Sequence, residues 1–370
     1  MLARGRPRGQ RPAEPAGRPG AAGLRPLPRA ALSAGAQPTT QPSARALSPG
    51  LLVGAGALVA LALALSAWAP LATYALGLAC FGLPHVLSEL RYVDARFKPR
   101  VPGGLLALWG LLLGAVVLGR AGALLGGWSV PPRLELGLVS ALVASALLVP
   151  GASGLWRAVA ALCLAALAAG VALAPLATFV ALSLLHNLTP LGFLAERLEG
   201  GRRRRALALG GLLFLGLPLL ILLGAPQSLL GQSQAPAPFG VLLADQLKGF
   251  VFPAWRSASW AERLFAAAVF TQCLHYLYVL LILPALDGRA AWWGQAPAGQ
   301  ERGTLLPWPG PLGTGLLLLA AAGLSLGLFV ALGFSAAKRC YALPAAVHAW
   351  IELPLLLAAP ALLSRAEAAS

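Results

Sequence analysis

Long unbroken apolar runs dominate this sequence and limit what it can fold into. The runs are rich in Leu, Ala, Val and Gly, and each approaches the ~20 residues that a helix needs to cross a bilayer. A transmembrane β-barrel would instead show short strands of alternating polarity. Only 11% of the residues are charged, against about a quarter in soluble domains. The sequence therefore predicts an all-α, polytopic integral membrane bundle of about ten transmembrane helices, at 51–68, 71–88, 104–120, 134–150, 158–174, 175–194, 206–224, 264–284, 311–334 and 342–363.

The basic residues indicate how these helices are oriented. Lys and Arg number 28 against 12 Asp and Glu, which gives a formal charge of +16. If the N-terminus is cytoplasmic, most of this excess, including the run at 202–205, falls on the cytoplasmic side, so the positive-inside rule predicts an N-in, C-in topology. We attribute the charge to loops and expect no nucleic-acid partner. The Ala-, Gly- and Arg-rich composition is typical of a bacterial protein and favours the bacterial inner membrane.

Two regions differ from the predicted helices. Residues 1–50 carry eight arginines against one acid, Glu14, and too few apolar residues to offset chain entropy. They are predicted to be a disordered basic tail, or else the product of a misassigned start codon. Residues 51–366 are predicted to form a single transmembrane domain. Within it, the 225–262 loop contains two Phe and two Trp at positions 250–260, which predicts an external segment lying along the membrane surface.

All four histidines of the chain, His85, His186, His275 and His348, lie inside predicted crossings. An unpaired polar group in hydrocarbon costs several kcal/mol, so such residues are functional candidates. The four helices that carry them all run from outside to inside. At 1.5 Å per residue, three of the histidines lie about 17–21 Å from the outer end and His348 about 9 Å. Because imidazole suits Fe, Cu, Zn and Ni, four converging histidines predict a transition-metal site.

Polar neighbours of the histidines are predicted to support this site. Glu89 and Glu352 each follow a histidine by one helical turn, so a carboxylate can accept the second imidazole N–H or bind the metal itself. Asn187 and Gln272 are the corresponding candidates beside the other two histidines, and Pro190 predicts that the helix loosens there. The competing interpretations are a solvated Glu89, histidines that merely bond between helices, and a bis-histidine haem.

The segment Gly82-x-Pro84-His85-x-x-x-Glu89 resembles one found in the Brp/Blh-type membrane β-carotene 15,15′-dioxygenases. The resemblance implies a polytopic helical protein whose four histidines hold iron and which cleaves β-carotene with O₂ into two retinals. This chain departs from the family pattern at Val86, where Gly is usual, and at Glu89, where Asp is usual. It also has no H-x-x-x-H pair. Only His85 carries over through the motif, so the other three ligands rest on topology.

We therefore expect a membrane-embedded non-haem oxygenase that cleaves or oxidises a lipophilic isoprenoid such as a carotenoid. Fe(II), or another transition metal, would be held by the four histidines, with no catalytic residue beyond the metal ligands. The partners would be the lipid bilayer, a lipophilic substrate and O₂. The alternatives are a metal- or proton-coupled transporter and a membrane-assembly protein with structural histidines. Few polar residues interrupt the crossings, which favours an enclosed site over a transport path.

Overall fold

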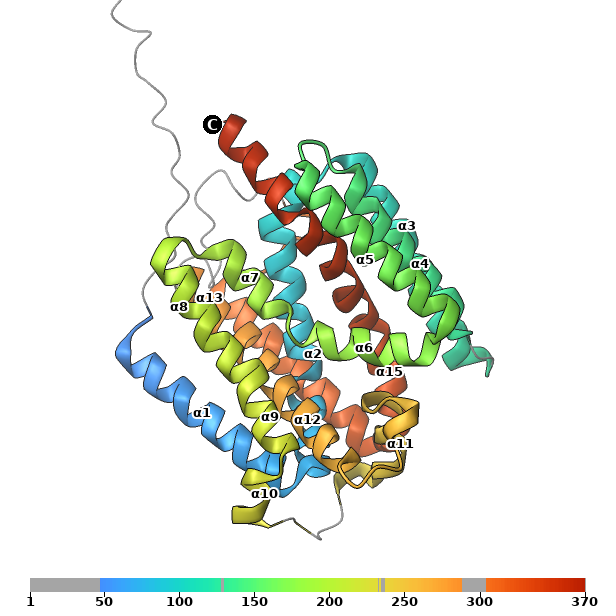
Figure 1. Cartoon of the computed structure of the whole chain (residues 1–370), viewed down its shortest axis with the longest axis vertical. Coiled ribbons are helices and arrows are strands. Elements are labelled where there is room, and N and C mark those ends of the chain that lie inside the picture. The colour runs from blue at the N-terminus through green and yellow to red at the C-terminus, as the bar shows by residue number, and fades with distance from the viewer. Residues whose placement is uncertain (1–46, 128–129, 232, 234–236, 288–303, 370) are drawn as a thin grey trace, which may run out of the picture. The chain divides into compact units, whose positions relative to one another are not determined.

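The computed structural model describes residues 47–127, 130–231, 233, 237–287 and 304–369 (Figure 1). Throughout this part of the chain every regular element is a helix, which confirms the all-α prediction. Nearly all of the predicted basic tail at 1–50 lies outside the described residues. The principal helices are α1 (Pro49–Trp68), α2 (Pro70–Phe97), α3 (Gly103–Gly126), α4 (Pro132–Ser145), α5 (Gly154–Leu173), α6 (Pro175–His186), α7 (Thr189–Arg197), α8 (Gly200–Gly211), α9 (Leu217–Leu222), α10 (Ala225–Leu230), α11 (Leu243–Phe250), α12 (Ala261–Leu277), α13 (Leu283–Asp287) and α15 (Pro311–Ala369).

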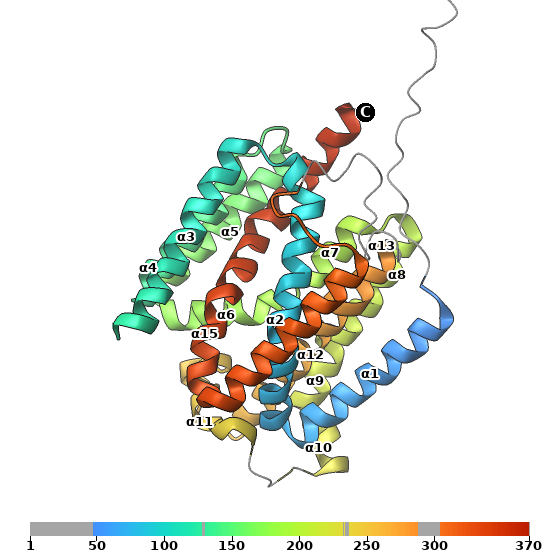
Figure 2. The same cartoon turned by 180° about the vertical axis from the view of Figure 1, so that it is seen from behind.

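The described helices indicate a multi-pass membrane protein. Seven of them are long and apolar enough to cross a bilayer, and an eighth span results if the bent pair α6 and α7 is counted as one. The predicted ten spans are thus not confirmed. One reason is α4, whose 14 residues would extend only about 21 Å. Another is α15, which is continuous by hydrogen bonding but breaks at Gly333, where φ is 71°. Its two arms form a V in Figure 2 and occupy the last two predicted segments.

Prolines and serines set several helix starts. Proline occupies the first turn of α1, α2, α4 and α6, where its missing N–H is not needed and its fixed φ suits a helix. Ser48 and Ser153 cap α1 and α5 by accepting a backbone N–H. Single-residue connections at Ala69 and Ala174 then join α1 to α2 and α5 to α6. The proline-containing connections of the sequence therefore produce adjacent, contacting helices.

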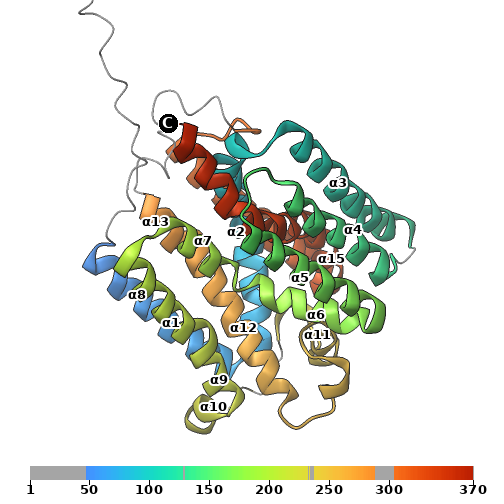
Figure 3. The same cartoon turned by 45° about the horizontal axis from the view of Figure 1, so that its top comes forward.

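Helices α2, α12 and the second arm of α15 form the centre of the bundle. In Figures 1 and 3, α3, α4 and α5 lie on one side of α2 and α15, and α1, α8, α9 and α12 lie on the other. The spans of α12 and α2 are 67% and 44% buried, whereas those of α1, α3 and α5 are only 11–17% buried. The outer helices expose leucines such as Leu111, Leu118 and Leu162. An apolar surface of this extent is what lipid contact requires.

The 225–262 segment folds as short helices rather than as an open loop. It contains α10, the turns η5 (Pro238–Gly240) and η6 (Pro253–Trp255), and α11, which packs against α12 and α6. The ring of Trp255 contacts Phe252 edge to face and Trp260 at a tilt, with ring centroids 4.9 and 5.3 Å apart. Aromatic side chains grouped at the end of a span suit the membrane interface that the sequence predicts. The side of the membrane on which the segment lies stays a prediction.

Candidate metal centre

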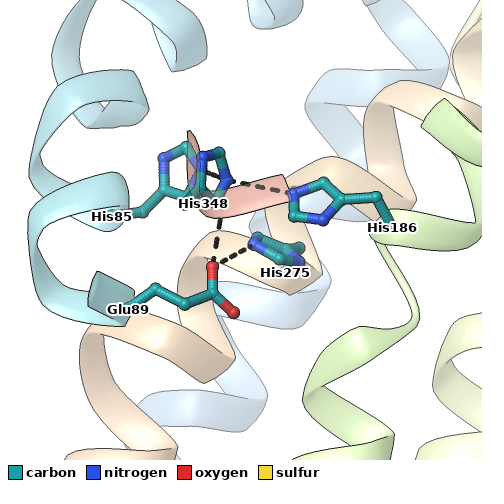
Figure 4. Close-up of side chains that lie close together, drawn as sticks. All are labelled: His85, Glu89, His186, His275 and His348. Atoms are coloured by element: carbon teal, nitrogen blue, oxygen red, sulfur yellow. Dashed lines mark hydrogen bonds and ion pairs between the residues drawn. The ribbon is translucent and has the colours of Figure 1, made fainter. Parts of the chain in front are cut away.

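The four histidines meet at one point in the centre of the bundle, although they come from distant parts of the chain. His85 is on α2, His186 ends α6, His275 is on α12 and His348 is on the second arm of α15. One ligand atom from each of them, and one from Glu89, all lie within 4.8 Å of one another. Figure 4 shows the four rings and the carboxylate directed toward a shared centre. His348, whose depth from the sequence differs from the others, belongs fully to this cluster.

The spacing of the imidazole nitrogens is that of ligands around one ion. His348 Nε2 lies 3.2 Å from His85 Nε2 and 3.1 Å from His186 Nε2. Metal–nitrogen bonds of about 2.0–2.2 Å place neighbouring ligand nitrogens roughly 2.8–3.6 Å apart in octahedral or tetrahedral sites. Each nitrogen of a neutral imidazole either donates or accepts a hydrogen bond, but not both. Hydrogen bonds between neutral rings therefore do not account equally well for the two short distances that His348 Nε2 makes.

The ring of His85 is oriented by its own helix. Its Nδ1 donates to the carbonyl of Phe81, one turn earlier, at 3.0 Å. This places the proton on Nδ1 and leaves the Nε2 lone pair directed at the cluster, as a metal ligand requires. Pro84 and Gly82 precede the histidine inside α2, and the missing side chain of Gly82 allows close approach by the ring of Tyr341, 3.2 Å from where a Cβ would lie.

The ring of His186 is oriented by a carboxylate from another helix. Glu352 Oε2 lies 2.9 Å from His186 Nδ1, while Nε2 of the same ring faces His348. Glu352 is completely buried. The sequence predicted that Glu352 supports a ligand, and its i+4 position suggested His348; the structure places it on His186. In metalloproteins, a carboxylate–histidine pair of this kind fixes the tautomer of the ring and increases the basicity of its other nitrogen.

Glu89 lies among the ligand atoms themselves. Its Oε2 is 3.3 Å from His275 Nε2 and 4.0 Å from His348 Nε2. Only 1% of its side chain is exposed, so the interpretation of Glu89 as a solvated residue is wrong. Of the two roles that the sequence left open for this carboxylate, its position suits direct metal binding better than orientation of a histidine.

The other two predicted supporting residues bond elsewhere. Asn187 Nδ2 donates to the carbonyl of Ser183, one turn earlier, at 3.3 Å. Gln272 Nε2 donates to the hydroxyl of Tyr276 at 2.5 Å. Neither amide has a hydrogen bond to a histidine among the described residues. Gln272 therefore acts on the site only through Tyr276.

Tyr276, which lies beside two of the histidines, is not among the residues singled out from the sequence. Its ring centroid lies 4.4 Å from that of His85 and 6.1 Å from that of His275. The side chain is 5% exposed, and the ring centroid of Phe81 lies 6.5 Å from that of Tyr276. The sequence did contain a signal for Tyr276. Gln272 precedes it by one helical turn, and residues at i and i+4 share a helix face, so the amide could be expected to bond the hydroxyl.

The donor set fits a divalent transition-metal ion. Both nitrogens of His275 and both oxygens of Glu89 are buried without a regular hydrogen bond. In the described part of the chain, no Lys or Arg forms an ion pair with Glu89 or Glu352, which are 1% and 0% exposed. Burying two uncompensated carboxylates among neutral imidazoles would be costly, and one divalent cation would balance their charge.

Comparisons with known proteins do not supply a function. No model of a protein family matches the chain. No curated protein matches it. No solved structure matches it either. The chemistry of the centre is therefore argued from its residues and their geometry.

Proposed function

We propose that this protein is a membrane-embedded, non-haem Fe(II) oxygenase that cleaves or oxidises a lipophilic isoprenoid such as a carotenoid. The observation that carries the proposal is the convergence of four imidazoles and one carboxylate within 4.8 Å, inside an apolar bundle. His85 lies midway along the candidate span Pro70–Arg100, and His275 lies near the middle of Ala261–Leu286. The centre therefore sits at mid-depth, where a membrane-dissolved substrate is available and water is scarce.

The ligands favour non-haem iron over haem. In a bis-histidine haem, the porphyrin ring fills the plane between the two axial imidazoles. Here the remaining two histidines and Glu89 occupy that space, since all five ligand atoms are mutually close. Imidazole nitrogen with carboxylate oxygen is a donor set that Fe(II) accepts well, although Zn²⁺ and other ions of the series also accept it.

Each residue of the centre has a definite task in this proposal. His85, His186, His275, His348 and Glu89 hold the ion. The carbonyl of Phe81 fixes the ring of His85, and Glu352 fixes that of His186. When bound, Fe(II) supplies the binding and activation of O₂ beside the substrate. No protein side chain is needed as a general base, because oxidative cleavage of a polyene does not begin with removal of a proton.

The polar groups outside the centre also favour an enclosed site over a transport path. A transporter needs available polar side chains at several depths. In the described residues, buried Glu135 is engaged by Arg120 and Trp350, and buried Asp94 accepts from the backbone of Leu305. These carboxylates hold helices together, so they do not extend a path from the histidines.

Metal analysis of the full-length protein, purified in detergent, tests the proposal. We expect about one iron per chain, no haem absorption, and loss of iron on replacing any one of the four histidines or Glu89 by Ala. Thr271→Val is the matched control. Thr271 is a buried residue of α12 one turn from His275, but its hydroxyl donates to its own helix at Ala267. This variant should keep its iron.

A second measurement tests the reaction. The iron-loaded protein in lipid nanodiscs containing a carotenoid should consume O₂ and release an aldehyde or ketone fragment, and His275→Ala should abolish both. A folded protein that binds no metal would contradict the proposal. So would one that binds only zinc, or one that moves metal ions or protons across vesicles without consuming O₂.

A further inference from the structure

The five ligand residues are not equally enclosed. The side chains of Glu89, His275 and His348 are 1–3% exposed, and His85 is 2% exposed. The side chain of His186 is 15% exposed. Its Nδ1 is nevertheless buried against Glu352, so the exposed part of the side chain lies away from that nitrogen. The centre thus comes to the molecular surface at His186.

The surface around the exposed part of His186 is apolar. Leu185, the preceding residue, is 54% exposed. His186 shares its centre with His85 and His275, which lie in the middle of their spans. Mid-depth on a membrane-spanning bundle faces hydrocarbon rather than water. A molecule that meets the exposed part of His186 therefore arrives from the lipid.

A break between two helices lies at the same place. Helix α6 ends at His186, α7 begins at Thr189, and the two are bent by 42°. Only Val180 is buried among the 12 residues of α6, whereas α7 buries Thr189, Pro190, Phe193 and Leu194 among nine. The break therefore separates a lightly covered helix from a firmly packed one.

Glycines fix α7 in its position. A Cβ on Gly192 would lie 2.8 Å from Leu356 of α15, and one on Gly210 of α8 would lie 2.4 Å from Leu191 of α7. Such close approach packs α7 firmly against its neighbours. Gly170 of α5 approaches α6 in the same way, since a Cβ there would lie 2.4 Å from the hydroxyl of Thr178. The break at His186 therefore lies between two segments that are each held by a neighbouring helix.

At His85 the centre is bordered by aromatic rings. The ring centroid of Tyr276, which is 5% exposed, lies 4.4 Å from that of His85, and the ring of Phe81, which is 51% exposed, lies 6.5 Å from that of Tyr276. Among the described residues, the ring contacts of His186 are with His275 and His348.

We propose that uncharged, lipophilic molecules reach the metal centre sideways from the bilayer at His186, past Leu185 and the break between α6 and α7. This inference rests on the proposed function in one respect, namely that the entering molecule is a lipophilic substrate. The route itself is a property of the chain and can be tested without metal. A charged or water-soluble molecule would have to enter through hydrocarbon, so the route also sets the substrate class.

The first test uses diethyl pyrocarbonate, an uncharged reagent that acylates imidazole, on the metal-free full-length protein in lipid nanodiscs. The chain has only four histidines, so peptide mapping by mass spectrometry follows all of them. We expect His186 to be modified several-fold faster than His85, His275 or His348. Leu185→Trp should slow modification of His186 several-fold by covering the exposed part of the ring. Leu162→Trp, at an exposed leucine of α5, is the control and should change nothing.

The second test follows loss of metal from the loaded protein. A neutral lipophilic chelator such as phenanthroline should remove the metal several-fold faster than the charged chelator EDTA, and Leu185→Trp should slow that removal. Equal modification of the four histidines, fastest modification of His85, or equal slowing by Leu162→Trp would overturn the route. If the protein binds no metal, the proposed function fails, but the order of histidine modification still decides where the centre opens.

Discussion

Glu352 is a buried carboxylate whose one described ion-pair partner is His186, at 2.9 Å. If it acts by holding that ring, replacing it weakens the metal site without removing a ligand. We expect Glu352→Gln to lower metal affinity by about 10–100-fold, the range typical of groups that orient a metal-binding histidine. Glu352→Leu should cost more, because it also leaves His186 Nδ1 without an acceptor. Competitive metal titration of the purified variants measures this.

Glu89 provides the contrast at the same scale. As a direct ligand it should matter more than Glu352, although both are buried carboxylates of similar exposure. We expect Glu89→Gln to reduce metal affinity further than Glu352→Gln, and Glu89→Gln alone to change the visible absorption of the cobalt-substituted protein. Equal effects of the two variants on affinity and spectrum would show that Glu89 only orients a histidine.

At the scale of elements, Asp94 joins α2 to the segment that leads into α15. Its carboxylate accepts from the backbone N–H of Leu305 and Leu306, at 2.7 and 3.1 Å, and from the indole of Trp308 at 2.8 Å. Asp94→Ala leaves these donors unpaired, so we expect a loss of about 2–3 kcal/mol in the free energy of unfolding. Thermal unfolding in detergent measures the change.

The control for this prediction is Asp245→Ala. Asp245 pairs with Lys248 at 2.8 Å on the exposed surface of α11, where the two side chains are 47% and 66% exposed. Such surface pairs contribute little, about 0–1 kcal/mol. An Asp94 variant no less stable than the Asp245 variant would mean that the segment before α15 is held by other contacts.

Arg120 makes a second connection between helices. It bonds Glu135 of α4 through two nitrogens and the carbonyl of Ala342 of α15, and Trp350 donates to the same carboxylate. Arg120→Leu leaves the charge of Glu135 buried without its cation, with only the indole of Trp350 donating to it, which should cost about 3–5 kcal/mol. Because Trp350 lies between His348 and Glu352 on α15, we also expect metal content to fall. Arg205→Leu, at an exposed arginine of α8, is the control and should change neither the free energy of unfolding nor the metal content. Thermal unfolding and metal analysis measure these two quantities.

The sequence predicts the members of the centre better than their pairing. The four histidines stood out because every one lay in an apolar run, where a polar group is costly whatever the fold. The partner of Glu352 depends on how α6 and α15 pack, and helical spacing alone carries no such information. Gln272 and Asn187 found partners on their own helices, since side chains of this kind bond locally when a neighbour is in reach.

The ten predicted spans are not confirmed, for a similar reason. Hydropathy locates apolar segments but does not show whether each is one straight helix of full length. Residues 175–194 are broken after His186, as Pro190 had indicated, and 134–150 contain a helix of only 14 residues. Both segments pack against neighbouring helices, and these contacts decide where a helix ends.

For the whole molecule, the open question is the direction of the bundle. The candidate span Gly200–Leu222 has 23 residues and is about 35 Å long, enough to cross the hydrocarbon. The arginines at 202–205 begin this span and α10 follows its end, so the two must lie on opposite sides of the membrane. The positive-inside rule then predicts that the arginines are cytoplasmic and that the 225–262 segment is external. Reporter fusions after Arg100, Arg205 and Arg302 should read cytoplasmic, and a fusion within 225–262 should read external. A cytoplasmic signal from 225–262 would reverse every helix. The metal centre would stay at mid-depth even then, because His85 lies midway along its span whichever end faces inward.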